Sequence, residues 1–147
     1  MTDTAHSYRL PRFEHARVAD AMRTGTLSCP SHAPLREVAR TMATHHIHCV
    51  IVTDVEPGAP AAAPGWRMLS DLDLVGAARG GGFDDLAAVD AAASEALSVT
   101  PDDTLERAAQ LMTEHGTAHL VVVDAAERPI GMLSTLDLAG AAAWGEA

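Results

Sequence analysis

The chain has 147 residues, of which 48% are apolar and only five are aromatic, a composition that excludes a disordered chain and indicates an aliphatic core. Twenty acidic residues stand against ten arginines and no lysine, and the formal net charge is −10. Nucleic acids and anionic membranes attract clustered basic residues, so neither is an expected partner. The sequence has no leading apolar stretch and no run long enough to span a membrane, and we therefore expect a cytoplasmic protein.

An internal duplication organises the sequence. A shift of seventy residues lays TLSCPSHAPLREVARTMATHHIHCVIVTD over ALSVTPDDTLERAAQLMTEHGTAHLVVVD. After a longer connection in the first copy, MLSDLDLVG returns as MLSTLDLAG. The repeats are predicted at 18–78 and 88–142, preceded by an N-terminal extension over 1–17 and followed by a tail over 143–147. Half-size pieces bury marginal cores alone, so the two copies are expected to cooperate.

The first copy predicts five elements in chain order: a short strand around Leu27, a helix from Leu35, strands at 49–52 and 66–69, and a helix over 70–78. Apolar residues recur at helical spacing from Leu35 to Met42. Pro34 suits the first turn of that helix, where a missing N–H has no cost. The run CVIV reads as a buried strand.

A glycine-rich linker over 79–87 is predicted to join the copies, since RGGGFDD contains three successive glycines. The second copy repeats the order of the first. It has a strand around Leu97, a helix from Leu105 that ends at Gly116, strands at 120–123 and 130–133, and a helix that starts near Ser134. Gly116 is expected in the left-handed conformation that commonly follows a helix.

With the stretch PDDTLERAAQLMTEHGTAHLVVVD and the closing GMLSTLD, each repeat resembles the CBS domain, named after cystathionine β-synthase, and the pair resembles a Bateman module. The resemblance implies an α+β fold of tandem repeats, each β-α-β-β-α, packed around a pseudo-two-fold axis. It also implies a regulatory module rather than an enzyme. Such a module would bind AMP, ADP, ATP or S-adenosylmethionine in clefts between the repeats, with no required cofactor, and signal as a homodimer to a regulated protein.

The family's closing motif is Gly, two apolar residues, Ser or Thr, two further residues and Asp. The second copy matches it with Gly131, Ser134 and Asp137. The resemblance implies that the Asp carboxylate accepts the ribose hydroxyls and that the Ser faces the ribose or phosphate, for which a helix start is suited. The first copy keeps Ser70 and Asp73 but has Arg67 in place of the glycine. Arg67 either narrows that cleft or contacts a phosphate.

A second interpretation of the same residues is purely structural. Ser followed three positions later by Asp, just before an apolar run, is also the pattern of a capping box, in which each side chain bonds the other's backbone N–H. In that case the motifs are only helix caps, and the chain is a ligand-free dimerisation scaffold. Both interpretations can hold for one copy.

Further site residues follow from the resemblance alone. Ser28 and Ser98 are placed near the sugar and phosphate, although each hydroxyl could equally bond its own backbone at a strand end. Backbone groups would contact the base at Cys29, Pro30, Val99 and Thr100. The other wall of the adenine slot would be formed by Ile47, His48, Thr117 and Ala118.

The cluster HHIHC raises the question of a zinc site. Alternation along the expected strand puts His46 and His48 on one side and Cys49 on the other, so three ligands do not converge and no metal is expected. The same alternation excludes a Cys-His nucleophile pair. Cys29 and Cys49 are expected to be reduced structural thiols, with a disulfide as the less favoured alternative.

One charge distinguishes the two copies. Asp71 follows Ser70, whereas Thr135 follows Ser134. Like charges some 4 Å apart repel by about 4 kcal/mol in a surface-like dielectric. We therefore expect the second cleft to accept phosphates more readily than the first, and polyphosphates such as ATP to need Mg²⁺.

Overall fold

The fold was analysed in a computed structural model of the chain, which describes residues 12–54, 65–92 and 97–145. The connection at 57–64 and most of the N-terminal extension lie outside these ranges, as do the last two residues. The fold is α+β, and two compact units are formed: Thr26–Ala96 is one, and Met1–Gly25 together with Leu97–Ala147 is the other. Each unit is described by itself.

The first unit contains a three-stranded sheet in the order β2-β3-β4. Its strands are β2 (Ser28–Pro30), β3 (Cys49–Thr53) and β4 (Arg67–Ser70), with β2 parallel and β4 antiparallel to β3. Two helices accompany it, α2 (Leu35–His45) and α3 (Asp71–Arg79). The stripe Leu35, Val38 and Met42 packs with Val50, Val52 and Leu69 in one buried cluster. The predicted helical spacing is thus the buried face of α2.

The second unit repeats this plan with one strand more. Its sheet has the order β1-β7-β6-β5, formed by β1 (Arg23–Thr24), β5 (Ser98–Val99), β6 (His119–Val123) and β7 (Pro129–Ser134). Its helices are α5 (Leu105–His115) and α6 (Thr135–Trp144). Leu105, Ala108 and Met112 of α5 share a buried cluster with strand residues Leu120, Val122 and Leu133. The predicted order of strand, helix, two strands and helix is confirmed in both copies.

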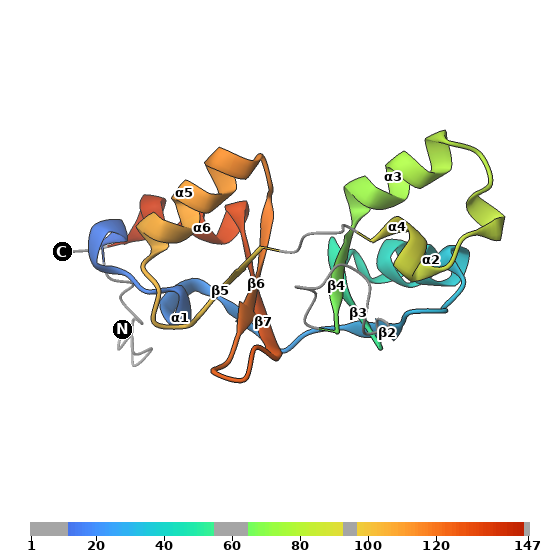
Figure 1. The fold of residues 1–147 in the computed structure, drawn as a ribbon. Helices are drawn as coiled ribbons and strands as arrows, with labels where there is room; N and C mark the ends of the chain where they lie inside the picture. The colour runs from blue at the N-terminus through green and yellow to red at the C-terminus, as the bar shows by residue number, and fades with distance from the viewer. Residues whose placement is uncertain (1–11, 55–64, 93–96, 146–147) are drawn as a thin grey trace, which may run out of the picture. The chain divides into compact units, whose positions relative to one another are not determined.

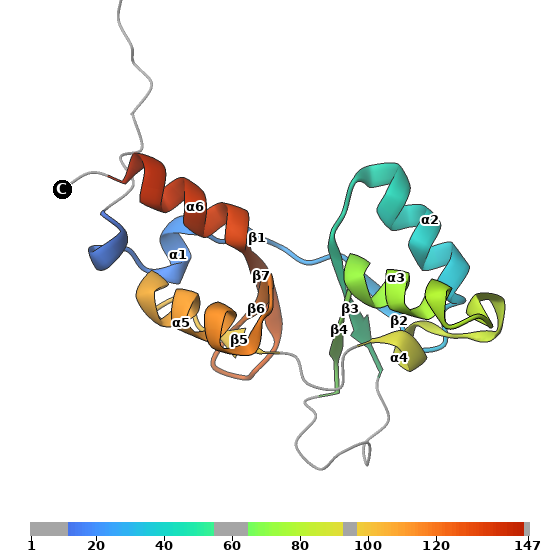
Figure 2. The same ribbon diagram turned by 90° about the horizontal axis from the view of Figure 1, so that it is seen from above.

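The leading segments of the two repeats are exchanged between the units. The turn η1 (Phe13–His15) and helix α1 (Val18–Ala21) belong to the unit of α5 and α6, whereas η2 (Phe83–Asp85) and α4 (Ala88–Ala91) belong to the unit of α2. Figures 1 and 2 show α1 (blue) beside α5 and α6 (orange to red), and α4 (yellow) beside α2 (cyan).

Equivalent hydrogen bonds hold the exchanged segments in both units. Val18 N donates to Asp103 O over 2.8 Å, and Ala88 N donates to Ala33 O over 2.8 Å. Asp20 accepts from the Arg17 backbone N–H at 2.7 Å, as Asp90 does from that of Ala87 at 2.9 Å. The duplication therefore includes the leading segments, because the same bonds recur seventy residues apart.

The glycine-rich segment between the repeats ends in a packed turn. Gly81 and Gly82 adopt positive φ angles of 74° and 72°, which glycine tolerates without strain. The following turn η2 then packs against α2, where the Arg36 guanidinium pairs with Asp84 and lies 5.4 Å from the centre of the Phe83 ring. The hydrogen bond from Arg36 lowers the pKa of Asp84 below its usual value.

The ends of α2 and α5 use the same backbone geometry. Gly116 follows α5 with φ 61°, which confirms the predicted left-handed residue, and His46 follows α2 with φ 53°. Strand β3 begins only at Cys49. The expected strand alternation of His46 and His48 is therefore wrong, because these residues lie in the helix end and the connection that follows it.

Candidate functional site

Both Ser-x-x-Asp motifs form capping boxes. Ser134 N donates to Asp137 Oδ2 over 2.8 Å, and Asp137 N donates to Ser134 Oγ over 3.2 Å. In the first copy the corresponding distances between Ser70 and Asp73 are 2.9 and 3.2 Å. The predicted caps at the starts of α3 and α6 are confirmed. Each aspartate uses Oδ2 for the cap, so its Oδ1 is not part of the capping box.

Strand register brings residues of the predicted adenine wall next to each motif. Asp71 N donates to His48 O over 2.9 Å, and Thr135 N donates to Ala118 O over 3.0 Å. The start of the central strand therefore lies beside the start of the closing helix in each unit. Residues brought together in this way are Ile47, His48, Ser70 and Asp73 in the first unit and Thr117, Ala118, Ser134 and Asp137 in the second.

The predicted residues of the leading strands lie elsewhere in each unit. Ser28 pairs with Ile51 and Ser98 pairs with Val121, so both serines lie on the side of the central strand opposite to the motif strand. One strand separates them from Ser70 and Ser134, which corresponds to about 10 Å across the sheet. Within a single unit, the leading-strand serine and the motif serine do not form one site.

The backbone near the leading strands is only partly open to a ligand. Val99 is 2% exposed as a whole residue, so little of its side chain or backbone is open to a ligand within the unit. The Cys29 carbonyl already accepts a hydrogen bond from Thr53 Oγ1 over 3.3 Å. Pro30 and Thr100 are exposed at the ends of these strands.

Gly131 is required by close backbone packing in the second unit. A Cβ atom at Gly131 would lie 2.5 Å from Arg23 O and 2.5 Å from Met22 Cε. Only glycine therefore lets β1 pair with β7 at this register, where Thr24 lies opposite Gly131. Glycine at this position of the motif is therefore explained by the close approach of β1, without any ligand.

The same packing brings Arg23 to the predicted ribose ligand. Arg23 Nε lies 3.5 Å from Asp137 Oδ1, the oxygen that the capping box does not use. The Asp137 side chain is 12% exposed and that of Arg23 is 73% exposed. Sequence reasoning did not find Arg23, because 114 residues separate the pair and position 93, the counterpart of Arg23, is an alanine.

The first unit has different charged neighbours at its motif. Arg67 lies on β4 opposite Val52, and its Nε is buried without a hydrogen-bond partner among the described residues. His48 Nδ1 lies 2.9 Å from Asp71 Oδ2, so the additional carboxylate of this copy has an imidazole partner. Asp71 Oδ1 accepts a hydrogen bond from Leu72 N over 2.9 Å.

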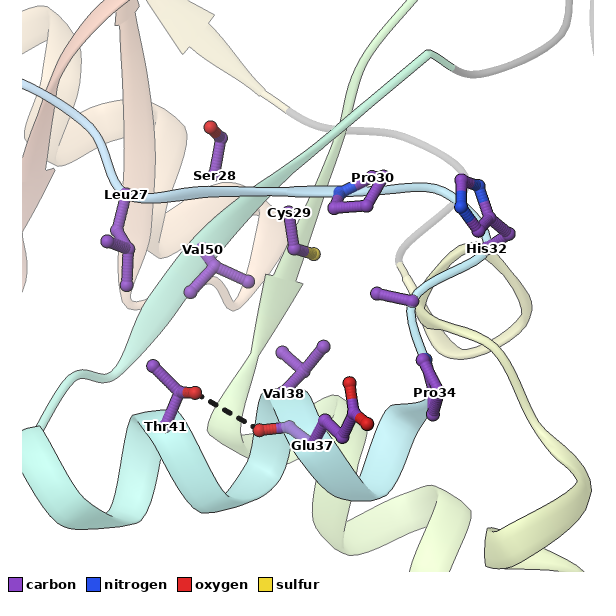
Figure 3. A pocket seen from close by; sticks show the side chains of 11 residues that line it. Leu27, Ser28, Cys29, Pro30, His32, Pro34, Glu37, Val38, Thr41 and Val50 are labelled. Carbon is purple, nitrogen blue, oxygen red and sulfur yellow. Dashed lines mark hydrogen bonds between the residues drawn. The ribbon is translucent and has the colours of Figure 1, made fainter.

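A pocket of about 410 Å³ lies between β2 and α2 of the first unit (Figure 3). Cys29 points toward the helix, whereas the Ser28 hydroxyl points to the opposite side of the strand. The walls are mostly apolar, with Glu37 and Thr41 contributed by α2. Three predicted site residues, Ser28, Cys29 and Pro30, line this pocket. Its second wall is α2 rather than Ile47 and His48.

Burial raises the pKa of both cysteine thiols of the first unit. Both cysteines are free, and burial raises the pKa of the Cys49 thiol to about 12, with smaller contributions from Asp73 and Asp71. Within the described ranges, no group of three His, Cys, Asp or Glu side chains could hold a metal ion.

No described helix is long and apolar enough to cross a membrane.

The two units define an α+β tandem-repeat protein in which a Ser-x-x-Asp motif joins the last strand of each sheet to the following helix. The family model of the CBS domain matches residues 18–57 and 88–143. The chain therefore belongs to the CBS domain family. No curated protein matches it in sequence.

Solved structures of similar fold include CBS-domain proteins. The CBS-domain-containing protein ATU1752 from Agrobacterium tumefaciens is 22% identical, with a TM-score of 0.73 over 85% of this chain and 92% of its own. The CBS domain protein PAE2072 from Pyrobaculum aerophilum, solved with AMP, is 26% identical, with a TM-score of 0.69 over 82% and 88%. The CBS domain pair of protein MJ0100, solved with 5′-methylthioadenosine and S-adenosyl-L-methionine, is 17% identical, with a TM-score of 0.70 over 85% of this chain and 94% of its own.

Proposed function

We propose that the chain is a regulatory module that binds an adenosine-containing ligand and signals through a homodimer. The ligand is AMP, ADP, ATP or S-adenosylmethionine, with Asp137 and Asp73 accepting the ribose hydroxyls. The observation that carries the proposal is that the two carboxylate oxygens of Asp137 have different partners. Its Oδ2 accepts both the N–H and the hydroxyl of Ser134, at 2.8 and 2.9 Å, while Oδ1 pairs with the largely exposed Arg23.

A cap and a ribose ligand are therefore compatible at one residue. A carboxylate accepts several hydrogen bonds, and those to a charged acceptor are the stronger ones. The cap holds Asp137 in place, so the carboxylate does not lose conformational freedom again when ligand binds. The complexes of PAE2072 with AMP and of MJ0100 with S-adenosyl-L-methionine support an adenosine ligand for this fold.

Dimer formation is supported by the apolar surface of the closing helices. Leu72 and Val75 on α3 are 75% and 63% exposed, and Leu136 and Trp144 on α6 are 71% and 75% exposed. Large apolar side chains this exposed on both helices are typical of a surface that a partner covers. A second copy of the chain would present the same side chains.

A thermal-shift titration tests ligand binding. A ligand at one hundred times its dissociation constant stabilises the folded state by about 2.7 kcal/mol, which raises the midpoint of a chain this size by roughly 5 to 11 °C. AMP, ADP, ATP and S-adenosylmethionine are tested separately at millimolar concentration. The absence of a shift with every one of these ligands contradicts the proposal.

The alternative function, a ligand-free scaffold, is favoured by the complete capping boxes at both motifs. Asp137→Ala distinguishes the two functions, with Asp20→Ala as the matched control. In each variant a backbone N–H, that of Arg17 or Ser134, loses the carboxylate acceptor that follows it by three residues. Each variant should therefore lose about 1 kcal/mol of stability. Only Asp137→Ala should also weaken AMP binding in calorimetry. Equal AMP affinity in the two variants assigns Asp137 a capping role alone.

A further inference from the structure

The Arg23 guanidinium is a cation held at the carboxylate that we assign to the ribose. Its Nε lies 3.5 Å from Asp137 Oδ1, and the arginine side chain is 73% exposed. The Asp137 side chain is 12% exposed, but the contact is long and the arginine lies largely in solvent, so the guanidinium can exchange its partner readily. The remaining N–H donors of the group are available to a ligand that reaches Asp137.

Backbone packing, rather than side-chain flexibility, brings this cation to the site. β1 pairs with β7 with Arg23 opposite Met132, and Gly25 N donates to Ile130 O over 2.8 Å. The position depends on Gly131, where a Cβ atom would meet Arg23 O at 2.5 Å. Glycine at this position of the motif and arginine on β1 are therefore parts of one arrangement.

The exchange of partners selects among adenosine ligands by charge. When ribose hydroxyls occupy Asp137 Oδ1, Arg23 loses its anionic partner, and a phosphate on the same sugar replaces it. Arginine binds phosphate through two parallel hydrogen bonds. Adenosine supplies the hydroxyls without the anion, and S-adenosylmethionine brings a cationic sulfonium in place of the phosphate.

We propose that Arg23 determines the ligand class of the Asp137 site, which takes an adenosine 5′-phosphate in preference to a neutral or cationic adenosine compound. This inference rests on the proposed function. Position 93 in the second repeat, the counterpart of Arg23, is an alanine and belongs to the unit of Asp73, so the preference belongs to the Asp137 site. Arg67, the arginine that the motif alignment singles out, lies in the other unit with its Nε buried.

Calorimetric titration of the full chain with AMP and with adenosine, in buffer free of divalent cations, tests the inference. The wild type should bind AMP at least about tenfold more tightly than adenosine. Arg23→Gln should bring the two affinities within about threefold by weakening AMP alone, and Arg23→Lys should retain a preference for AMP. Arg128→Gln is the matched control, since Arg128 also pairs with an aspartate, at 3.2 Å, and is 78% exposed.

The results distinguish a failure of the Arg23 inference from a failure of the proposed function. If the wild type binds both compounds and Arg23→Gln keeps the AMP preference, the role of Arg23 is wrong and the proposed function stands. If Arg128→Gln loses the preference as Arg23→Gln does, the effect is one of general charge and the inference is again wrong. If the wild type binds neither compound nor S-adenosylmethionine, both the inference and the proposed function are overturned.

Discussion

Gly131→Ala is predicted to destabilise the second unit. The added Cβ would meet the Arg23 carbonyl oxygen and the Met22 methyl carbon at 2.5 Å, about 1 Å closer than a favourable nonbonded contact. The methyl group can rotate away, but the carbonyl belongs to β1, which pairs with β7 at this position. Either β1 separates from β7 or the strand is strained, and overpacking of this kind costs about 1 to 3 kcal/mol.

Gly140→Ala in α6 is the matched control for this substitution. A Cβ there would lie 3.7 Å from the Trp144 ring, an ordinary contact, and alanine in a helix should stabilise by about 0.4 to 1 kcal/mol. Urea unfolding followed by circular dichroism should therefore move the two midpoints in opposite directions. In thermal unfolding, Gly131→Ala should lower the midpoint by roughly 2 to 12 °C. A Gly131→Ala protein as stable as the wild type refutes the packing argument.

Three further predictions concern the thiols, the phosphates and the dimer. Burial raises the pKa of Cys49 to about 12, so its thiol should resist modification at pH 8 until urea is added. The stability that comes from keeping this thiol neutral should be lost as the pH rises from about 9 toward 12. Rapid labelling of both thiols in the native chain contradicts the prediction. Metal-free ATP should bind more weakly than AMP, because the net charge of −10 opposes a polyphosphate at both motifs and Asp71 adds to this at the first. Mg²⁺ should restore the affinity for ATP in calorimetry, and tighter binding of metal-free ATP than of AMP is the opposite result. Replacement of both Leu72 and Leu136 by Asp should abolish the self-association measured by light scattering. The double variant should still fold, since both side chains are more than two-thirds exposed. A double variant that assembles like the wild type shows that another surface forms the dimer.

Local sequence pattern was sufficient to predict the helices and caps whose defining residues lie close together in the sequence. The spacing of Leu35, Val38 and Met42 predicts the buried face of α2, and the same spacing from Leu105 predicts that of α5. Hydrogen-bond chemistry within four residues predicts both capping boxes. These signals succeed because the partners are close in sequence and the physical requirement is local.

Features that depend on distant residues were not predictable in this way. Helix α1 has only four residues and no apolar period of its own, and its position within the second unit is specified by distant partners such as Asp103. The pair formed by Arg23 and Asp137 follows from that exchange. A glycine in the RGGGFDD segment indicates where the chain can bend, but the packing of Phe83 and Asp84 against Arg36 requires the tertiary structure.

The central claim is that the ribose of an adenosine ligand binds Oδ1 of Asp137, the oxygen outside the capping box, in place of Arg23. A crystal structure of the full chain grown with AMP tests it most directly. We predict both ribose hydroxyls within about 3.2 Å of the Asp137 carboxylate, with Oδ2 still capping Ser134 and the phosphate at Arg23. AMP bound only in the pocket between β2 and α2, or at no site while Asp137 remains paired with Arg23, would contradict the account.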